Sequence, residues 1–463
     1  MLKRVLIANR GEIALRIQRA CRELDIETVA VYSQPDAEAL HVQLATQPVC
    51  IGPARAADSY LNQTALLTAA LATGCDGLHP GYGFLSENAD FAGACAREGL
   101  TFIGPSGGTI RKAGSKSAAR DIMRAAGVPV TPGSDGPVSS VEDALAAAER
   151  VGYPVLLKAS AGGGGRGIRR CDSAEALPAA YAEAKAEARA CFGNDEMYLE
   201  KLVLNPRHIE FQILADRHGN VIHLGDRDCS IQRRNQKLIE EAPARCLTPA
   251  LRQAMGDAAV RAAKAVGYEG AGTVEFLLDA DGQHFYFMEM NTRIQVEHGI
   301  TELITGVDLV RQQLRVASGL SLDMTQADIA LTGHAMECRV NAEDPRQDFR
   351  PCPGTVEFLH FPGGAGVRVD SHLYNGCALP PYYDSLAAKL MVHAPTRLEA
   401  IRKMRRALEE FALEGFPTNA ELSYQILYHP TFVRGGCTTA FLEENLPRLL
   451  DFNRRVDQHE DTV

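Results

Sequence analysis

The stretch GTVEFLLDADGQHFYFMEMN, residues 272–291, reads as two strands joined by a turn near Asp281 and Gly282. Folding about that turn brings Glu275 and Glu289 nearly opposite each other, and carboxylates directly across a ladder repel. A divalent cation with oxygen ligands removes this conflict, and Asn291 follows on the face of Glu289 as a third ligand. The hairpin therefore predicts a magnesium site; the alternative is a pair of glutamates that face solvent.

The second strand continues into EMNTRIQVEH, residues 289–298, where polar side chains alternate with apolar ones. In an extended strand, Glu289, Asn291, Arg293, Gln295 and Glu297 all lie on one face. Metal ligands come first, then an arginine and a glutamine that can hold an anion, then a glutamate that can move a proton. We therefore expect this face to carry the chemistry of the protein.

A glycine-rich loop lies upstream, in KASAGGGGRGIRR, residues 158–170. Four consecutive glycines and Gly167 let backbone amides approach a ligand closely, as phosphate-binding loops do. The loop matches GxGxxG, but the residues after Gly167 read as a strand and no GK[ST] ending is present. A flexible hairpin tip is therefore favoured over a Rossmann turn or a P-loop, and a surface turn without a ligand is the alternative.

Two lysines add positive charge for phosphates. Lys158 ends the apolar strand VLLKA, and Lys116 begins a helix that Ser115 is expected to cap. A cation at the positive end of a helix is unfavourable unless an anion lies there. Taken alone, Lys116 is better explained as a solvated lysine.

The segment RDCSIQRRNQKL, residues 227–238, is a basic patch in an acidic chain. Its hydrogen-bond donors are Arg227, Gln232, Arg233, Arg234, Asn235, Gln236 and Lys237. Such donors suit oxyanions, although a solvated charge run is the alternative. Together with the lysines, the glycine loop and the carboxylate pair, the patch indicates ATP-dependent activation of a small acid.

Length and composition limit the other possibilities. At 463 residues the chain is expected to form two to four domains, and a formal charge of −10 argues against nucleic acid or an anionic membrane as partner. No segment has the apolar length that spans a bilayer, and the apolar run at the N-terminus is too short for a signal peptide, so a cytoplasmic protein is expected. The twelve cysteines form no CxxC pair, which favours reduced, structural thiols over zinc ligands.

The first third of the chain alternates strand and helix patterns. Buried strands are expected at residues 4–8, 27–33 and 100–106, and this alternation predicts a parallel sheet with helices on both faces. The polar residues after 450 are expected to form a loose tail.

Helix boundaries are marked further along the chain. Ser139 with Glu142 and Thr396 with Glu399 fit capping boxes. A third helix is predicted to begin at Thr248–Pro249 and to end at Gly267.

The sequence resembles the biotin carboxylase family of ATP-grasp enzymes over residues 1–446. The motifs that carry the resemblance are IANRGEIA (7–14), HPGYGFLSEN (79–88), KASAGGGGRG (158–167), NPRHIE (205–210), RDCSIQRRNQK (227–237), EMNTRIQVEH, GHAMECRVNAEDP (333–345) and PYYDSLAAKL (381–390). It implies an α/β protein, α+β in its centre: a Rossmann-like domain at 1–113, an ATP-grasp domain at 114–330 with a mobile lid at about 131–203, a C-terminal domain at 331–446 and a flexible tail at 447–463.

The resemblance implies ATP- and bicarbonate-dependent carboxylation of biotin through carboxyphosphate. The residues it implies for ATP are Lys116, Lys158, Gly162, Gly163, Gly164, Gly165, Gly167, Glu200, Lys201, Val203, His208, Gln232 and Asn235, with Glu275, Glu289 and Asn291 holding Mg²⁺ or Mn²⁺. Those for bicarbonate are Lys237, Arg293, Gln295 and the backbone of Val296, with Glu297 as the base, and Arg339 holds the ureido oxygen of biotin. Gly299 stands where the family usually has proline.

No AMKM-like biotin attachment motif occurs in the sequence. The resemblance therefore implies that biotin arrives on a separate biotin carboxyl carrier protein, and that carboxyltransferase subunits choose the acceptor. Acetyl-CoA carboxylase, in fatty-acid synthesis, is favoured over a propionyl-CoA, pyruvate or other carboxylase, and a homodimer is expected.

Two rival interpretations are weaker. A carbamoyl-phosphate-type ligase should lack HPGYGFLSEN and the Arg339 segment. A non-catalytic assembly subunit should have lost at least one of Lys237, Glu275, Glu289, Arg293 and Glu297, and all five are present.

Overall fold

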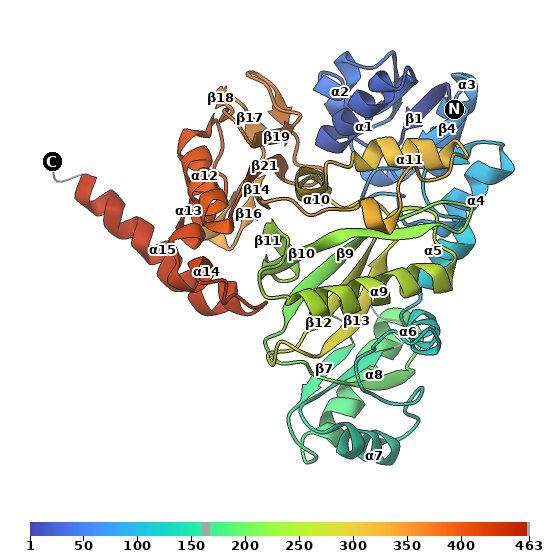
Figure 1. The fold of residues 1–463 in the computed structure, drawn as a ribbon, viewed down its shortest axis with the longest axis vertical. Coiled ribbons are helices and arrows are strands. Elements are labelled where there is room, and N and C mark those ends of the chain that lie inside the picture. The colour runs from blue at the N-terminus through green and yellow to red at the C-terminus, as the bar shows by residue number, and fades with distance from the viewer. Residues whose placement is uncertain (160–166, 461–463) are drawn as a thin grey trace.

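The structure is a computed structural model that describes residues 1–159 and 167–460; for residues 116, 117, 191, 192 and 452–460 it describes only the backbone. Figure 1 shows the N-terminal region at one end of the molecule, the region before and after the glycine loop at the other, and a long sheet between them. The C-terminal region lies beside this sheet, and helix α15 (Phe441–Glu460) projects from it.

Five parallel strands form the N-terminal sheet, in the order β3-β2-β1-β4-β5. Their bounds are β1 Arg4–Ile7, β2 Glu27–Ser33, β3 Gln47–Gly52, β4 Gly77–His79 and β5 Thr101–Phe102. Helices α1 (Gly11–Glu23), α3 (Gln63–Ala72) and α4 (Ala89–Arg97) cover it. Val5 and Ile7 pack with α1, whereas Leu6 packs with α3 and α4, because successive strand side chains point to opposite faces. The predicted parallel α/β unit is confirmed.

Eight antiparallel strands form the central sheet, in the order β13-β12-β9-β10-β11-β14-β21-β19. Their bounds are β9 Arg207–Ala215, β10 Val221–Arg233, β11 Gln236–Ala242, β12 Gly270–Leu278, β13 Phe285–Asn291, β14 His334–Asn341, β19 Val367–Ser371 and β21 Leu386–Ala394. The expected boundary between residues 330 and 331 precedes β14, which pairs with β11. The central and C-terminal regions therefore share one sheet.

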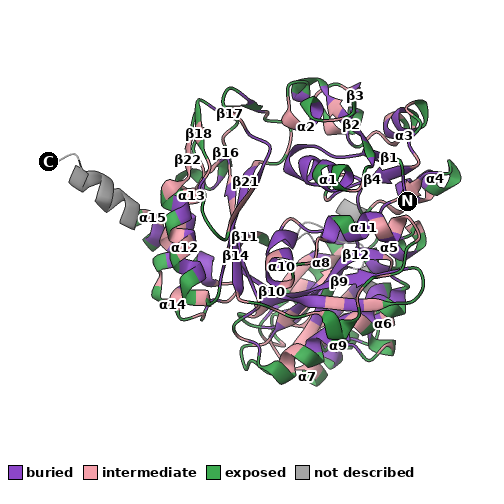
Figure 2. Cartoon of the chain, turned by 45° about the horizontal axis from the view of Figure 1, so that its top comes forward, coloured by how far each residue is buried: buried purple, intermediate pink, exposed green. Residues whose placement is uncertain are grey.

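Helices close this sheet on its outer faces. Helix α9 (Pro249–Val266) packs on β9, β10 and β12 through small side chains such as Ala259 and Ala262. Helix α11 (Leu309–Ala317) joins one core with α1 and so links the central sheet to the N-terminal region. Helices α10 (His298–Thr305), α12 (Arg397–Glu410) and α13 (Ala420–Tyr428) pack on β14 and β21 or on strands next to them. Figure 2 shows these strands largely buried and the outer faces of α7 and α9 exposed.

A smaller sheet, in the order β7-β6-β8, forms the remaining region with helices α7 (Val141–Val151) and α8 (Leu177–Phe192). Its strands are β6 Val155–Ala159, β7 Ile168–Cys171 and β8 Met197–Lys201. β6 and β7 pair antiparallel, with Lys158 opposite Ile168, so the glycine loop joins two strands of a hairpin as predicted. Its residues 160–166 lie outside the described part of the chain.

Shorter elements complete the chain. The helices are α2 Leu40–Gln43, α5 Gly107–Gly114, α6 Lys116–Ala125 and α14 Pro430–Val433. The paired short strands are β15 Glu343–Asp344 with β16 Arg350–Pro351, β17 Gly354–Thr355 with β20 Ala378–Leu379, and β18 Phe358–His360 with β22 Ala412–Glu414.

Two of the four predicted helix N-caps are observed. Thr248 caps α9, which ends before Gly267, and the Thr396 hydroxyl accepts the backbone N–H of Glu399. The capping box at Ser139 was placed one residue early, since Ser140 caps α7 by accepting the N–H of Asp143. Ser115 precedes α6, but its side chain makes no capping hydrogen bond.

The expected tail at 447–463 is wrong for most of its length, because α15 is helical to Glu460. Leu446, Leu449 and Leu450 recur at helical spacing and pack on the C-terminal core, and Glu443 and Glu444 lie in the first turn, where negative charge is favourable. Residues 461–463 lie outside the described part of the chain.

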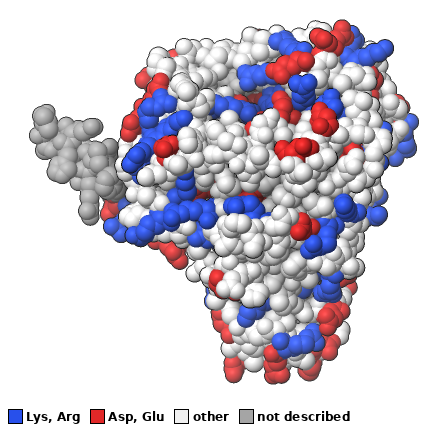
Figure 3. Space-filling model, in the orientation of Figure 1, with Lys and Arg blue, Asp and Glu red and all other residues white. Residues whose placement is uncertain are grey.

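The remaining features concern the cysteines, the distribution of surface charge and the hydrophobicity of the helices. The eleven cysteines whose side chains are described are free thiols. Acidic and basic side chains are interspersed over the face shown in Figure 3. Among the described residues, no helix combines the length and apolar character needed to cross a membrane.

Candidate active site

A cavity of about 1040 Å³ opens where the regions meet. Residues 9–12 and 82–84 line it at the carboxyl ends of β1 and β4, and residues 382–386 line it from the C-terminal region. The predicted site residues that line it are Lys158, Glu200, Lys201, Val203, His208, Gln232, Asn235, Lys237, Glu275, Glu289, Asn291, Arg293, Gln295, Val296, Glu297 and Arg339. Gly167 does not line it, whereas residues 162–165 and the Lys116 side chain lie outside the described part of the chain.

The β12–β13 hairpin has the predicted register. Glu275 lies opposite Glu289, and Gly282 in the turn has φ +67°, a conformation that glycine adopts without strain. Glu275 is 3% exposed, whereas Glu289 is exposed at the cavity. The two carboxylates therefore lie at different depths of one wall.

The strand does not continue through EMNTRIQVEH as expected. It ends at Asn291, the next residues turn, and α10 begins at His298. Glu87 binds the chain where it leaves the sheet. Its carboxylate accepts the backbone N–H of Thr292 at 3.0 Å and Nε of Arg293 at 3.0 Å. The polar side chains still meet, because Gln295 donates to Glu275 at 2.8 Å after the turn.

Lys237 lies at the centre of the polar wall. Its Nζ donates to Glu210 at 2.6 Å, Glu275 at 2.9 Å and Glu297 at 2.7 Å. Burial lowers the pKa of Lys237, but attraction to the three carboxylates outweighs burial, so this pKa lies well above its usual value. Lys237 is therefore a fixed positive charge at neutral pH.

Glu297 connects Lys237 to Arg339. The carboxylate is 1% exposed and accepts Nζ of Lys237 through one oxygen and a terminal nitrogen of Arg339, at 2.8 Å, through the other. Burial raises the pKa of Glu297, but Lys237, Arg339 and Arg227 lower it by more, and the net pKa lies well below its usual value. Arg339 also donates Nε to Glu240 at 2.7 Å.

Oxygen donors for a cation lie on the same wall. Asn291 donates its side-chain amide to Glu275 at 2.9 Å, and its amide oxygen accepts a terminal nitrogen of Arg293 at 3.2 Å. Glu275, Glu289 and Asn291 all line the cavity, and carboxylate and amide oxygens are ligands that Mg²⁺ prefers. The donor set therefore fits the predicted cation.

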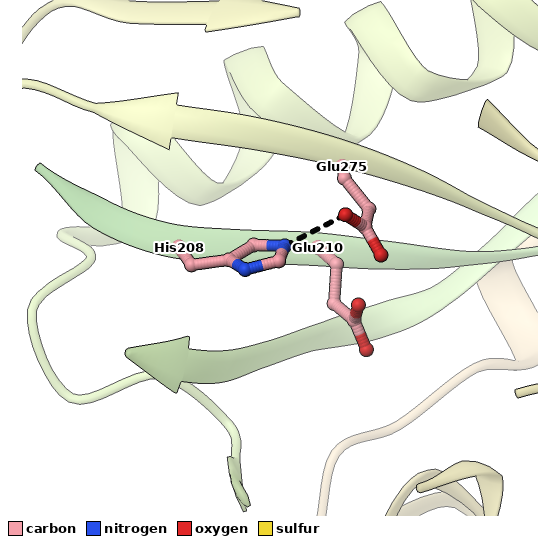
Figure 4. Close-up of side chains that lie close together, drawn as sticks. All are labelled: His208, Glu210 and Glu275. Carbon is pink, nitrogen blue, oxygen red and sulfur yellow. Dashed lines mark ion pairs between the residues drawn. The ribbon is translucent and has the colours of Figure 1, made fainter. Parts of the chain in front are cut away.

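Two further groups of buried residues could hold a metal ion, because the ligand atoms within each group all lie within 4.8 Å of one another. The first group is His208, Glu210 and Glu275, and the second is Glu210, Cys229 and Glu297. Figure 4 shows the first group, in which Nε2 of His208 lies 2.9 Å from Glu275. Burial lowers the pKa of His208, yet Glu275 raises it by more, so the net shift is upward. Lys237 bonds every carboxylate of both groups, whereas in the set of Glu275, Glu289 and Asn291 it bonds Glu275 alone, so this set stays the predicted cation site.

The other end of the cavity carries Lys158 and Glu200, which form an ion pair. Arg120, which the sequence did not single out, donates to Glu200 at 2.9 Å and lines the cavity. Nζ of Lys201 is bonded to the carbonyl oxygens of Gly152 at 2.8 Å and Tyr153 at 2.9 Å. Lys158 and Arg120 therefore supply the positive charge at this end of the cavity.

The basic patch divides, and the expectation that its arginines act together on an oxyanion is wrong. Arg227 is fully buried and binds Glu210, Gln212, Thr301, Thr273 and Gln295. Arg233 stacks on Phe349, with its guanidinium carbon 4.3 Å from the ring centre, and pairs with Asp348, as Arg234 does. Of the four basic residues, Lys237 alone lines the cavity, together with Gln232, Asn235 and Gln236.

Two residues that support the wall were missed by the sequence analysis. Glu87 holds Arg293, although the motif HPGYGFLSEN that contains it was recognised. Lys389 is fully buried and donates to the carbonyl oxygen of Val296 at 2.9 Å. Lys389 lies in the recognised motif PYYDSLAAKL, but its role was not predicted, because its partners come from distant parts of the chain.

Comparison with known proteins identifies the family of the chain. Three family models match successive parts of the chain: the biotin carboxylase N-terminal domain over residues 1–110, the carbamoyl-phosphate synthase L chain ATP-binding domain over residues 115–325, and the biotin carboxylase C-terminal domain over residues 337–444. Biotin carboxylase 1 of Bacillus subtilis is 55% identical over 443 residues, 96% of this chain and 98% of that protein. The chloroplastic biotin carboxylase of Arabidopsis thaliana is 54% identical over 448 residues, 97% of this chain and 83% of that protein.

Solved structures show the same fold. The biotin carboxylase domain dimer of Hydrogenobacter thermophilus 2-oxoglutarate carboxylase, in complex with MgADP, ADP and bicarbonate, has a TM-score of 0.90 at 50% identity and covers 97% of this chain and 98% of that one. A biotin carboxylase complex with β-γ-ATP from Campylobacter jejuni has a TM-score of 0.91 at 47% identity, over 96% of this chain and 99% of that one.

The fold and the cavity define an ATP-grasp enzyme. The chain belongs to the biotin carboxylase family, and it is an ATP-dependent ligase.

Proposed function

We propose that the chain carboxylates biotin carried on a separate biotin carboxyl carrier protein, by way of carboxyphosphate. The position of Glu297 carries this proposal, because the carboxylate joins Lys237, the proposed bicarbonate ligand, to Arg339, the proposed biotin ligand. A base between two cations can take a proton from an acid on one side while the second substrate binds on the other.

ATP is proposed to bind between the small sheet and the central sheet. Lys158 and Arg120 neutralise phosphate charge there, and His208, Gln232 and Asn235 line the same cavity. Glu275, Glu289 and Asn291 would hold Mg²⁺ or Mn²⁺, which when bound adds positive charge beside the phosphates. The predicted lid, residues 131–203, contains β6, β7 and β8, and its closure would exclude water from a labile intermediate.

Bicarbonate is proposed to bind Lys237, Arg293, Gln295 and the backbone of Val296. Glu297 takes its proton, the bicarbonate oxygen bonds to the γ-phosphorus, and the bond to ADP breaks, which yields carboxyphosphate. The depressed pKa of Glu297 reflects Lys237 and Arg339 as partners. When these cations bind substrate oxygens instead, Glu297 loses part of that stabilisation and becomes a stronger base.

Carboxyphosphate then breaks into CO₂ and phosphate. Phosphate takes the ureido proton of biotin, the deprotonated nitrogen attacks CO₂, and Arg339 stabilises the negative charge on the ureido oxygen. Arg339 is 16% exposed in its side chain and lines the cavity, so a biotin that enters the cavity can reach it.

We also propose which molecule accepts the carboxyl group and how the chain assembles with its partners. Relatives of similar identity include the biotin carboxylase domain of a 2-oxoglutarate carboxylase and the biotin carboxylase subunit of a pyruvate carboxylase. We favour a cytoplasmic homodimer that serves acetyl-CoA carboxylase with separate carrier and carboxyltransferase subunits. The dimer is supported by the dimeric Hydrogenobacter structure.

The test is bicarbonate-dependent ATP hydrolysis by the purified chain. We expect free biotin to stimulate phosphate release, and we expect a co-purified biotinylated protein to accept labelled carbon from bicarbonate. Phosphate release at background with all substrates present would refute the proposal. The choice of acceptor is tested in two ways. Mass spectrometry identifies the carboxyltransferase that co-purifies with the carrier, and labelled carbon should be transferred to acetyl-CoA but not to pyruvate.

A further inference from the structure

Beneath Arg339, two buried glutamates face each other across the sheet. Glu240 on β11 and Glu337 on β14 are direct partners in the antiparallel register, and both are fully buried. Directly opposed side chains have Cβ atoms about 4.5–5.5 Å apart. Two ionised carboxylates at that separation repel strongly when water is excluded.

Hydrogen bonding around the pair is incomplete. Glu240 accepts Nε of Arg339 at one oxygen, but its other oxygen has no hydrogen-bond partner within the described residues. Within the same residues, neither oxygen of Glu337 has one. Buried polar atoms almost always find a partner, so three such oxygens in one place need a physical explanation.

The surrounding charges cannot compensate two ionised carboxylates. From β21, Lys389 is bonded to the carbonyl oxygen of Val296 and pairs with Glu12 and Asp370. From β11, Lys237 is bonded to three other carboxylates.

The remaining neighbours add no positive charge at neutral pH beyond Arg339. Glu297, before α10, is itself an anion near the pair, and Cys229 on β10 has a pKa that burial raises well above its usual value. Burial, Lys389 and nearby arginines hold the pKa of His298 on α10 well below its usual value, so that ring is neutral.

We propose that Glu240 and Glu337 hold one proton between them, with Glu337 donating a hydrogen bond to Glu240, and that this acid pair positions Arg339 for biotin. One proton supplies a donor between the facing carboxyl groups and removes one of the two like charges. Glu240 then presents a single negative charge at Nε of Arg339. Glu240 is a positioning residue, because it acts on substrate through Arg339.

The titration directions agree with this arrangement. Burial raises the pKa of Glu240, Arg339 lowers it and Glu297 raises it, to a net value of about 7. Burial also raises the pKa of Glu337, and Glu240 raises it further against the attraction of Lys389, so that it lies well above the usual range. The two groups titrate as a pair, and the more basic position is Glu337.

Infrared difference spectroscopy on the full chain tests the shared proton. At pH 8 an ordinary glutamate, with a pKa of about 4.3, is fully ionised. We expect the wild-type protein to show a protonated carboxylic acid band at pH 8 that Glu337→Gln removes, while the thermal midpoint stays close to that of wild type. The amide of glutamine has the same shape and donates to Glu240 as the acid does.

The outcomes separate cleanly. If the wild-type spectrum has no protonated glutamate band at pH 8, or Glu337→Gln leaves the band unchanged, the shared proton is refuted. Should Glu337→Gln fail to fold, wild type labelled with ¹³C-glutamate decides the same question by the number of carboxyl groups that remain protonated at pH 8.

Kinetics test the positioning role, which rests on the proposed binding of biotin by Arg339. Glu240→Gln is expected to raise the KM for free biotin about tenfold, because a charge-assisted hydrogen bond to Arg339 is lost, and to leave the KM for ATP within about twofold. Glu337→Gln should keep the KM for biotin near that of wild type. Equal changes in both KM values for Glu240→Gln would refute positioning. A wild-type chain that ignores biotin altogether would refute the proposed function, whereas the infrared result would still stand.

Discussion

Glu297 shows how one side chain acquires its role from its neighbours. The carboxylate is buried, which alone favours its neutral form, yet Lys237 and Arg339 each donate to one of its oxygens and keep it ionised. If Lys237 and Arg339 bind substrate oxygens in place of Glu297, the carboxylate loses these partners, its pKa rises, and it becomes a stronger base. Its proposed function thus depends on charge, whereas the space it fills can be occupied by a neutral side chain.

Glu297→Gln keeps that shape and removes the basicity. We expect turnover in the presence of bicarbonate and biotin to fall about a hundredfold or more, as for the loss of a general base, while the affinity for ATP changes little. Steady-state phosphate release and calorimetric binding of ADP measure the two quantities. Glu302→Gln, in the same helix segment but paired with Arg16 and Arg368, is the matched control and should keep turnover. Parallel loss of nucleotide affinity and rate in Glu297→Gln would indicate a structural role instead.

His41 gives a stability prediction at the same scale. It is fully buried, and burial lowers its pKa to about 4, with Asp36 opposing and Arg10 adding to the shift. Below pH 6.5 the unfolded chain protonates this group, whereas the folded chain does so only near pH 4. The unfolded state is therefore favoured as pH falls through this window, by about 2 kcal/mol at pH 5.

His41→Gln removes this term. Between pH 7.5 and pH 5, the free energy of unfolding should decrease by about 2 kcal/mol less in His41→Gln than in wild type, as urea denaturation can measure. His218→Gln, on an exposed turn, is the control and should follow wild type. An identical pH dependence in wild type and His41→Gln would show that His41 is not held neutral by the fold.

At the level of elements, sequence patterns succeeded where local chemistry decides the outcome. The hairpin turn at Gly282, the register of Glu275 with Glu289 and the caps at Thr248 and Thr396 follow from neighbouring residues. EMNTRIQVEH was misread as one strand because alternation of polar and apolar residues also fits a chain pulled into a turn. The partner that does so, Glu87, lies 205 residues before Thr292, a distance that no local pattern reports.

The basic patch failed for a related reason. Arg227 and Lys237 are ten residues apart and both contact Glu210, yet Arg227 is sealed inside the sheet and Lys237 borders the cavity. Composition gives the number of charges, whereas the depth of each side chain in the sheet decides which charge meets a ligand. The candidate site was therefore predictable as a set of polar residues, but not the division between those that line the cavity and those that are buried behind it.

Helix α10 contains Gly299, and packing supplies a reason for a residue without a side chain there. A Cβ atom at Gly299 would clash with Sδ of Met391, which is fully buried on β21. Gly299→Ala should therefore cost about 1–3 kcal/mol of folding stability, since Met391 has to move.

The effect of Gly299→Ala on folding stability should change sign when Met391 is replaced by a smaller residue. In a Met391→Val background the contact is relieved, and Gly299→Ala should then stabilise by about 0.5–1 kcal/mol, as alanine does relative to glycine inside a helix. Urea denaturation of both single variants and the double variant gives the coupling energy. Additive effects of the two substitutions would show that Met391 is not what limits position 299.

Across the whole molecule, the cavity exists only because distant regions meet. Lys389, from the C-terminal region, pairs with Glu12 of the N-terminal region and bonds the backbone of Val296 in the central region. Parallel strands at one end, a shared antiparallel sheet and the small β6–β7–β8 sheet each give side chains to the same space. Binding of nucleotide and metal in that space should therefore stabilise the fold as a unit.

Thermal unfolding with and without Mg²⁺ tests the link between the carboxylate hairpin and the nucleotide. With a nonhydrolysable ATP analogue at 100 times its Kd, binding stabilises the folded chain by about 2.7 kcal/mol, and part of this gain should require Mg²⁺ or Mn²⁺. Glu289→Gln should remove the metal-dependent part and keep the part seen with the analogue and a chelator. Glu357→Gln, also at an exposed position, is the control and should retain both parts. If Glu289→Gln retains the full metal-dependent gain in melting temperature, the cation is held elsewhere, and the inner group of His208, Glu210 and Glu275 becomes the alternative site.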